Sequence, residues 1–185
     1  MKPGGPRRSA ILAAAEALFL AQGPRAASME AIARAAGVAK PTLYAYFADK
    51  DAILGALAEE LIAAQRRDLR EALGGDGEPA LRIAAALVVR GKHAMRVRAS
   101  PHGRELYGGE TLLAGPLLRD LEAELARDVE DTLARAGVQR ARLLGQLLLA
   151  ASSGIAEKAT APAELGPALR LLCERVIRPE LPGQR

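Results

Sequence analysis

Aromatic residues are scarce in this chain of 185 residues, which contains five of them and no tryptophan. Three of the five, Tyr44, Tyr46 and Phe47, lie in the segment GVAKPTLYAYFADK at residues 37–50. Beyond that segment the one ring is Tyr107, so the chain is poorly equipped to stack on flat multi-ring compounds. The sequence therefore predicts an aliphatic interior and a local role for the rings of residues 37–50.

Cysteine and histidine are almost absent, which narrows the chemistry open to the chain. The single cysteine, Cys173, excludes a disulfide within these residues and is typical of a reducing compartment. The two histidines, His93 and His102, occur without a phosphate-binding loop, a nucleophile motif or a paired metal-ligand motif. His102 and Glu105 could share a helical face, but two ligands make a weak metal site. We therefore expect no catalysis, no cofactor and no bound metal.

Long apolar segments are missing as well. The longest stretch without a charged residue is 143–156, and its 14 residues are too few to span a bilayer as a helix. The basic start MKPGGPRR and the apolar run after it resemble a signal peptide, but Glu16 interrupts the run. Ile11, Ala15 and Leu18 recur instead at helical spacing. We expect a soluble, cytoplasmic protein without a membrane partner.

Positive charge is present mainly at the N-terminus. Residues 1–50 contain seven Lys or Arg against three Asp or Glu, a net charge of +4, whereas the other 135 residues contain 19 of each sign. A small basic unit attached to a neutral body is typical of a protein that contacts nucleic acid.

Leucine and alanine dominate the composition and β-branched residues are few, which favours helices over strands. Ser28 and Asp49 are placed to cap helices, Gly23-Pro24 is a strong helix breaker, and Gly37 supplies a positive φ. The class predicted is all-α, with an N-terminal three-helix head followed by a helical bundle. The expected helices cover residues 8–22, 29–36, a short helix from residue 40, 50–73, 79–99, 101–107, 116–136, 139–158 and 163–178.

The second and third expected helices form a helix-turn-helix. They are joined by the short turn Gly37-Val38-Ala39, and Pro41 is tolerated because it falls in a first turn. In this arrangement the second helix of the pair enters the major groove of DNA. We predict a DNA-binding domain at residues 1–50 and a separate helical domain at 51–185.

The motif residues resemble the TetR family of bacterial transcriptional regulators. The resemblance rests on ILAAAEALFLAQG and ASMEAIARAAGVAKPTLYAYFADKDAIL, within residues 9–54, and the rest of the chain is compatible with the family without a diagnostic motif. It implies a homodimeric regulator, by family default a repressor, that binds a palindromic double-stranded DNA operator and is released by a small-molecule effector. A regulator-fold adaptor that acts through protein contacts without binding DNA is the alternative.

The resemblance also implies which residues contact DNA. Ser28 should meet phosphate at the start of the second helix, and Lys50 should meet the DNA backbone. The residues expected to line the recognition helix are Lys40, Pro41, Thr42, Tyr44 and Tyr46. From the helical spacing, Tyr44 and Tyr46 share a face with Lys40, whereas Leu43 and Phe47 lie opposite and anchor the helix.

An effector site is expected on helix 79–99, whose inward line we assign to Leu81, Ala85, Val88, Lys92 and Met95. Lys92 then falls on an apolar line, which predicts either a lysine that extends past the core or an anionic ligand with an aliphatic tail. The residues expected to hold such a ligand are Lys92, Met95, Arg96, Leu106, Tyr107, Leu112, Leu113 and Leu147. Residues 143–156 are apolar on nearly every side, so we expect a partner subunit to cover them.

Overall fold

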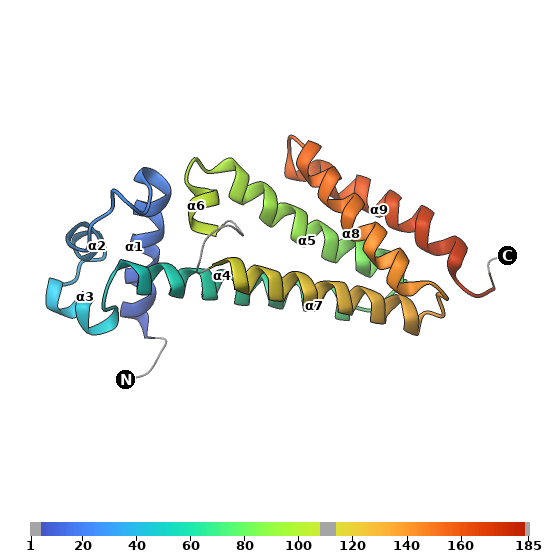
Figure 1. Ribbon diagram of the computed structural model, residues 1–185, viewed down its shortest axis with the longest axis horizontal. Coiled ribbons are helices and arrows are strands. Elements are labelled where there is room, and N and C mark those ends of the chain that lie inside the picture. The colour runs from blue at the N-terminus through green and yellow to red at the C-terminus, as the bar shows by residue number, and fades with distance from the viewer. Residues whose placement is uncertain (1–4, 108–113, 184–185) are drawn as a thin grey trace. The chain divides into compact units, whose positions relative to one another are not determined.

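The computed structural model describes residues 5–107 and 114–183 of the chain (Figure 1). Over these ranges the regular structure is entirely helical, which confirms the predicted all-α class with an N-terminal helix-turn-helix. The helices are α1 (Pro6–Gln22), α2 (Met29–Ala35), α3 (Lys40–Tyr46), α4 (Lys50–Gly74), α5 (Pro79–Ala99), α6 (Gly103–Tyr107), α7 (Ala114–Arg135), α8 (Ala141–Lys158), α9 (Pro162–Ile177) and the 3₁₀ turn η1 (Arg178–Glu180).

The helices are grouped in two compact units. The head unit comprises the described residues of Met1–Ile62 and Val97–Leu118, and the body unit comprises those of Ala63–Arg96 and Arg119–Arg185. Helix α4 contributes its first half to the head unit and its second half to the body unit.

Local signals set the ends of the head helices. The Ser28 Oγ accepts a hydrogen bond of 3.1 Å from the backbone N–H of Ala31, which caps α2 as predicted. The Asp49 Oδ1 accepts a hydrogen bond of 2.8 Å from the N–H of Ala52 and caps α4 in the same way. Gly37 follows α2 with a φ of 66°, a backbone conformation that glycine adopts without strain.

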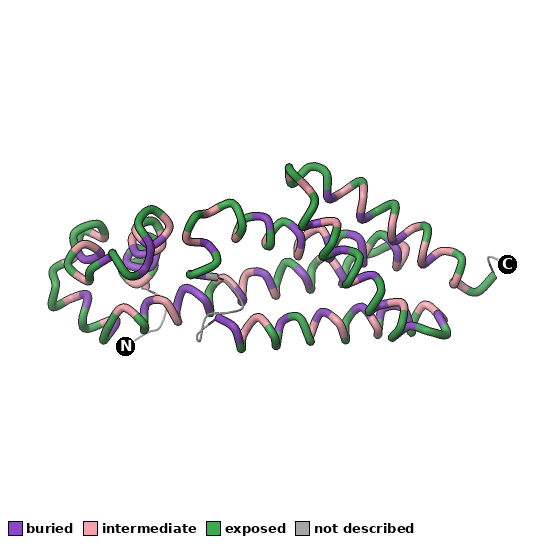
Figure 2. Tube along the Cα trace, turned by 45° about the horizontal axis from the view of Figure 1, so that its top comes forward, coloured by how far each residue is buried: buried purple, intermediate pink, exposed green. Residues whose placement is uncertain are grey.

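The head unit is held together by one apolar core, to which α1, α2, α3, α4 and α6 all contribute. Its members include Phe19, which is fully buried, and Leu106 from α6. The buried residues of the head core are Ile11, Leu12, Ala15, Phe19, Ala27, Ile32, Ala33, Leu43, Phe47, Ile53, Ala56, Leu57 and Leu106. Figure 2 shows buried and exposed stretches following one another along the tube of the head helices.

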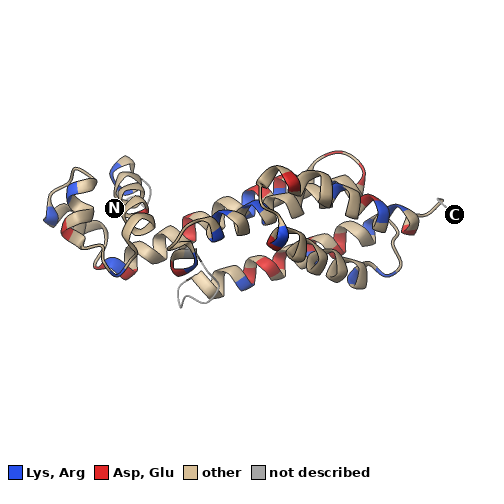
Figure 3. Cartoon of the chain, turned by 90° about the horizontal axis from the view of Figure 1, so that it is seen from above, with Lys and Arg blue, Asp and Glu red and all other residues tan. Residues whose placement is uncertain are grey.

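The body unit contains the second half of α4, most of α5 and α7, and the whole of α8 and α9. Helices α8 and α9 pack side by side, as Figure 1 also shows. Charges of both signs occur on the helices of this unit (Figure 3), although α5 contains Lys and Arg without Asp or Glu. One of its ion pairs joins Arg178 to both carboxylate oxygens of Glu78, at 2.8 and 2.9 Å, and ties η1 to the start of α5.

The hydropathy of the described helices bears on membrane insertion. Across residues 5–107 and 114–183, none of them reaches the length and apolar character that crossing a bilayer requires.

Candidate nucleic-acid interface and ligand-binding residues

The turn between α2 and α3 presents the short helix α3 at the surface of the head. The N–H of Val38 donates to the carbonyl of Ala33 at 3.0 Å, and the N–H of Gly37 donates to that of Arg34 at 3.2 Å. These bonds close the end of α2 and redirect the chain within three residues. The two seven-residue helices therefore have the helix-turn-helix connection that the sequence predicts.

Helix α3 has one buried and one exposed side. Leu43 is fully buried and Phe47 nearly so, and both belong to the head core, as the helical spacing predicts. Lys40 and Pro41 are exposed, and Tyr44 is 44% exposed. An exposed tyrosine on so short a helix is a large amphipathic side chain without a place in the core, and it is available to a ligand.

Two of the expected contact residues on α3 are less accessible than the sequence suggests. Thr42 and Tyr46 are half-buried. The side chain of Tyr46 packs against the head core. Tyr46 therefore shares less of the exposed face with Tyr44 than we predicted.

Lys40 at the start of α3 is held by two neighbours. Its Nζ donates a hydrogen bond to the carboxylate of Glu30 on α2. It also lies 5.9 Å from the centroid of the Tyr44 ring, within the range of a cation–π contact. The hydrogen bond from Lys40 lowers the pKa of Glu30, and the same bond raises the pKa of Lys40. Both side chains are therefore charged over the physiological range.

Lys50 has a structural role within the head. Its Nζ donates to the backbone carbonyls of Arg25 and Ala27, at 3.3 and 3.2 Å. The side chain thus ties the start of α4 to the segment before α2, and a contact with DNA phosphate would be additional to these bonds.

The start of α1 is likewise held within the head. Arg8 pairs with Glu60 and lies 5.5 Å from the centroid of the Phe47 ring. Arg7 is exposed.

The inward line predicted for helix α5 is wrong. Leu81 is 38% exposed, Ala85 and Lys92 are exposed, and only Met95 of that line is buried. The side of α5 that is buried is formed by Ala80, Ile83, Ala84, Ala86, Leu87, Gly91 and Met95. Lys92 therefore lies on a solvated face, and the apolar environment that suggested a buried cation is absent around it in the described structure.

The remaining residues proposed for a ligand are scattered. Arg96 is exposed, Leu147 is 55% exposed on α8, and Leu106 belongs to the head core rather than to a pocket. The sequence pattern places Leu106 in the domain of residues 51–185, whereas the structure places it in the head unit, because α6 packs against the head helices. The Tyr107 side chain and residues 112 and 113 lie outside the described part of the chain.

A polar cluster that the sequence did not reveal lies inside the body unit. The Nε of Arg90 donates to both carboxylate oxygens of Glu122 at 2.9 Å, and its Nη1 donates to Ser152 at 3.3 Å and Ser153 at 3.0 Å. The cluster joins α5, α7 and α8. Ser152 is 2% exposed. An arginine within an alanine-rich helix gave no sequence signal for it.

Two buried polar atoms of the body unit lack partners among the described residues. They are the Oε1 of Gln65 on α4 and the Nε2 of His93 on α5. Burial lowers the pKa of His93, the charge of nearby Arg96 lowers it further, and Glu122 partly opposes both. His93 is therefore a neutral imidazole at neutral pH, able to donate or accept one hydrogen bond. Across the described ranges, no three His, Cys, Asp or Glu side chains are grouped as metal ligands would be.

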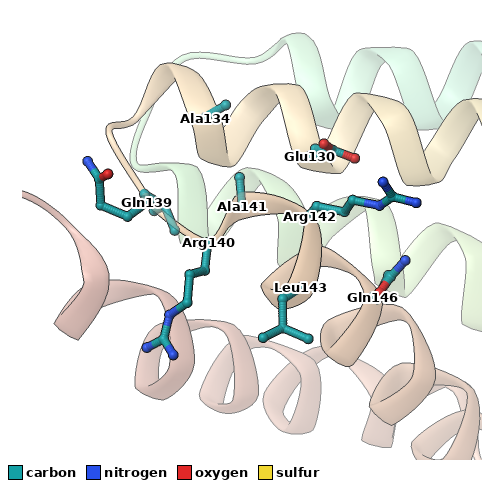
Figure 4. Close-up of a pocket in the computed structure, with 9 residues that line it drawn as sticks. Glu130, Ala134, Gln139, Arg140, Ala141, Arg142, Leu143 and Gln146 are labelled. Atoms are coloured by element: carbon teal, nitrogen blue, oxygen red, sulfur yellow. The ribbon is translucent and has the colours of Figure 1, made fainter.

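Helices α8 and α9 leave apolar side chains exposed. Leu143, Leu147 and Leu171 are 51%, 55% and 56% exposed. Beside Leu143 lies an open hollow of about 460 Å³, lined by the end of α7, the α7–α8 turn and the first turns of α8 (Figure 4). A second open hollow of about 440 Å³ between α8 and α9 is lined by small residues such as Gly154 and Ala168 and by the charged Lys158 and Glu164.

Comparison with known proteins agrees with this geometry. Residues 11–57 match the family model described as bacterial regulatory proteins, tetR family. That segment contains α2, α3 and the turn between them. Among curated proteins, no match is found.

Solved structures with the same fold cover nearly the whole chain. A transcriptional regulator of the TetR/AcrR family from Thermobifida fusca is 22% identical, with a TM-score of 0.70 over 98% of this chain and 100% of that one. A TetR-like transcriptional regulator from Rhodococcus sp. RHA1 is 22% identical, with a TM-score of 0.68 over 95% and 97%. The fatty acid degradation regulator FadR from Bacillus halodurans is 18% identical, with a TM-score of 0.63 over 100% and 99%. At these identities the likeness establishes the fold alone, which is TetR-like over the described residues.

Proposed function

We propose that this chain, whose residues 11–57 form a DNA-binding domain of the TetR family, is a ligand-responsive transcriptional repressor. The observation that carries the proposal is helix α3, which buries Leu43 and Phe47 and leaves Lys40, Pro41 and Tyr44 exposed. We assign DNA binding to residues 1–50 and ligand binding and dimerisation to residues 51–185. DNA binding, rather than catalysis, is the activity proposed.

On DNA, α3 is proposed to enter the major groove with Lys40, Pro41, Thr42 and Tyr44. Lys40 can donate to the acceptors of guanine, and the Thr42 methyl group can pack on thymine methyl groups. The Ser28 end of α2 is proposed to meet phosphate. With so few base-reading side chains, phosphate contacts should supply most of the affinity, and binding should weaken steeply as salt is added.

A homodimer is the proposed binding species. Helices α8 and α9 expose the large apolar side chains of Leu143, Leu147 and Leu171. Exposure of such side chains to water is unfavourable, and a partner subunit would bury them. Gly154 and Ala168 lie on the same two helices and would let a partner helix approach closely. A two-fold interface through this surface would present two α3 helices to the two halves of a palindromic operator.

The effector is proposed to bind the body unit. An aliphatic compound suits a chain so poor in rings, and one solved structure with this fold is described as a fatty acid degradation regulator. Lys92 and Arg96 remain the cations proposed for an anionic headgroup. Because both cations are exposed, the headgroup would lie at the surface, and the tail would extend toward Met95. Leu106 and Leu147 would not contact this ligand. Since α4 belongs to both units, it is the proposed route by which the effector changes the head.

Selection of DNA from a random-sequence library, followed by gel shift of the selected duplex, tests the proposal. Enrichment of a palindrome and binding that weakens steeply with salt are expected. Failure to retain any duplex would overturn the proposal and favour an adaptor that acts through protein contacts. Release of the duplex by fatty acids, but not by planar cationic dyes, would identify the effector class.

A further inference from the structure

The ion pair between Glu30 and Lys40 bridges the two helices of the helix-turn-helix. Glu30 lies in the first turn of α2, and Lys40 is the first residue of α3. The two side chains are 57% and 54% exposed, so they meet at the surface of the head rather than in its core. A pair in this position contributes little to the stability of the fold, because solvent screens it.

Lys40 is nonetheless the residue of the exposed α3 face that can donate most strongly to a base edge. Its ammonium group is engaged by the Glu30 carboxylate on one side and by the Tyr44 ring on another. The ammonium group has three N–H donors and gives one of them to Glu30, so two remain for acceptors of DNA. The carboxylate itself is repelled by phosphate.

We propose that Glu30 is a specificity-determining residue, which holds Lys40 in place for a guanine edge and prevents it from adding to sequence-independent phosphate binding. The inference rests on the proposed DNA-binding function and concerns a residue to which that function assigns no contact.

The physical basis is the negative charge that Glu30 places beside Lys40. On an arbitrary sequence, a phosphate that reaches Lys40 also comes close to the Glu30 carboxylate, which repels it. On the correct sequence the O6 and N7 of guanine offer Lys40 two acceptors in the groove. Glu30 thus removes more affinity from the wrong DNA than from the right DNA, which is how a repulsive element creates specificity.

The test compares the wild type with Glu30→Gln by fluorescence anisotropy, on the selected duplex and on a random duplex of equal length. The variant frees Lys40 for phosphate, so its binding to random DNA should tighten and the ratio between the two affinities should fall. The salt slope on random DNA should steepen by about 0.9 for each head, which corresponds to about 3.5-fold more loss per head between about 50 and 200 mM salt.

Asp51→Asn is the matched control. Asp51 is an exposed acidic residue in the first turn of α4, as Glu30 is in the first turn of α2, so both variants lose one negative charge of the head at the same kind of site. The control should leave the affinity ratio near its wild-type value. A double-mutant cycle with Lys40→Gln completes the test, because Glu30→Gln should have no further effect on the ratio once Lys40 is gone.

Equal affinity ratios for wild type and Glu30→Gln would overturn the inference and leave the proposed function intact. The same holds if Asp51→Asn changes the ratio as much as Glu30→Gln does, or if the effect of Glu30→Gln persists without Lys40. If the wild type distinguishes no duplex from random DNA, the proposed function and the inference both fail. Thermal melts of each variant show that any change in binding arises in a folded protein.

Discussion

At the scale of single residues, glycines fix the places where the chain comes close to itself. Gly103 begins α6, and a Cβ built on it would lie 2.1 Å from the backbone oxygen of Val97. That distance is far shorter than the van der Waals contact between a carbon and an oxygen. The clashing atom belongs to the backbone, so no change of side-chain rotamer can relieve the clash. Gly103 is buried, and its helix brings Leu106 into the head core. Glycine is therefore required at this position by space rather than by its φ.

Gly103→Ala should destabilise the protein by about 2 kcal/mol or more, because the added methyl group forces the segment before α6 to move. The measurement is the free energy of unfolding from urea melts. Gly55→Ala in α4 is the control, since a Cβ there meets nothing within 4 Å among the described residues. It should raise stability by about 0.5–1 kcal/mol through helix propensity. Equal effects of the two substitutions would contradict the close approach at Gly103.

Protonation of His93 should lower the stability of the fold at mildly acidic pH. Burial lowers its pKa below the ordinary value of 6.5, with Arg96 adding to the effect and Glu122 opposing it. In the unfolded chain His93 binds a proton as the pH falls through about 6.5, whereas in the folded chain it binds one only at lower pH. The free energy of unfolding is therefore not reduced by His93 above about pH 6.5, and it declines as the pH falls below that value.

His93→Gln should reduce the drop in melting temperature between neutral pH and about pH 5.5, because glutamine does not titrate. Differential scanning fluorimetry across this range measures it. His102→Gln, at the other histidine of the chain, should leave most of the drop in place. A drop that is unchanged in His93→Gln would show that other groups cause the acid sensitivity.

At the scale of elements, the proposed function gives different roles to the lysines at the starts of α3 and α4. Lys40 lies on the exposed side of α3, whereas Lys50 donates hydrogen bonds to the carbonyls of Arg25 and Ala27. In the proposed complex, Lys40 would read a base edge, and Lys50 would contact the DNA backbone while it holds the start of α4 to the segment before α2. Their loss should therefore be felt differently.

Lys40→Ala should weaken binding to the selected operator by about 1–3 kcal/mol and relax the choice of sequence. Lys50→Ala should weaken binding to specific and random DNA alike, and it should also lower the melting temperature because two carbonyls lose their donor. Gel shifts on both duplexes, with thermal melts alongside, distinguish the two patterns. Equal losses on specific and random DNA for both variants would contradict these different roles.

The buried side of helix α5 was mispredicted because the helix is rich in alanine. Alanines occur on several of its sides, so more than one line of apolar residues fits the helical period. We chose the line through Leu81 and Lys92, whereas the neighbouring line through Ile83, Leu87 and Gly91 is the buried one. Packing against the neighbouring helices determines which side of α5 is buried. Those helices can pack against small residues as closely as against large ones, so residue size does not identify the buried side.

At the scale of the whole molecule, the exposed leucines of α8 and α9 bear on assembly. If a partner copy covers Leu147, a charge there would be buried without a counter-ion, and two-fold symmetry would repeat the penalty on both sides. Leu147→Glu should then weaken the dimer by at least about 100-fold. Sedimentation velocity across a range of protein concentrations measures the change.

Leu81→Glu is the control for assembly, because Leu81 is an exposed leucine of the same body unit on another helix. It should leave the distribution of monomer and dimer unchanged. A dimer that persists in Leu147→Glu would place the interface elsewhere, and a monomeric wild type would remove the homodimer from the proposed function.

The helix-turn-helix of the head could be predicted from the sequence alone because its signals are local. Ser28 and Asp49 cap helices through atoms three residues away, Gly37 turns the chain by its own φ, and the spacing of Leu43 and Phe47 marks the buried side of α3. Each of these depends on the backbone within a turn or two, so the residue type and its position suffice.

Tertiary structure alone decided the contacts between residues far apart in the sequence. Leu106 joins the head core across a separation that no periodicity encodes, and Arg90 finds Ser152 and Glu122 from two other helices. The pairing of Lys40 with Glu30 likewise depends on the angle at which α3 leaves α2. Such contacts follow from how helices pack around a shared core, which a sequence specifies only through all of its residues together.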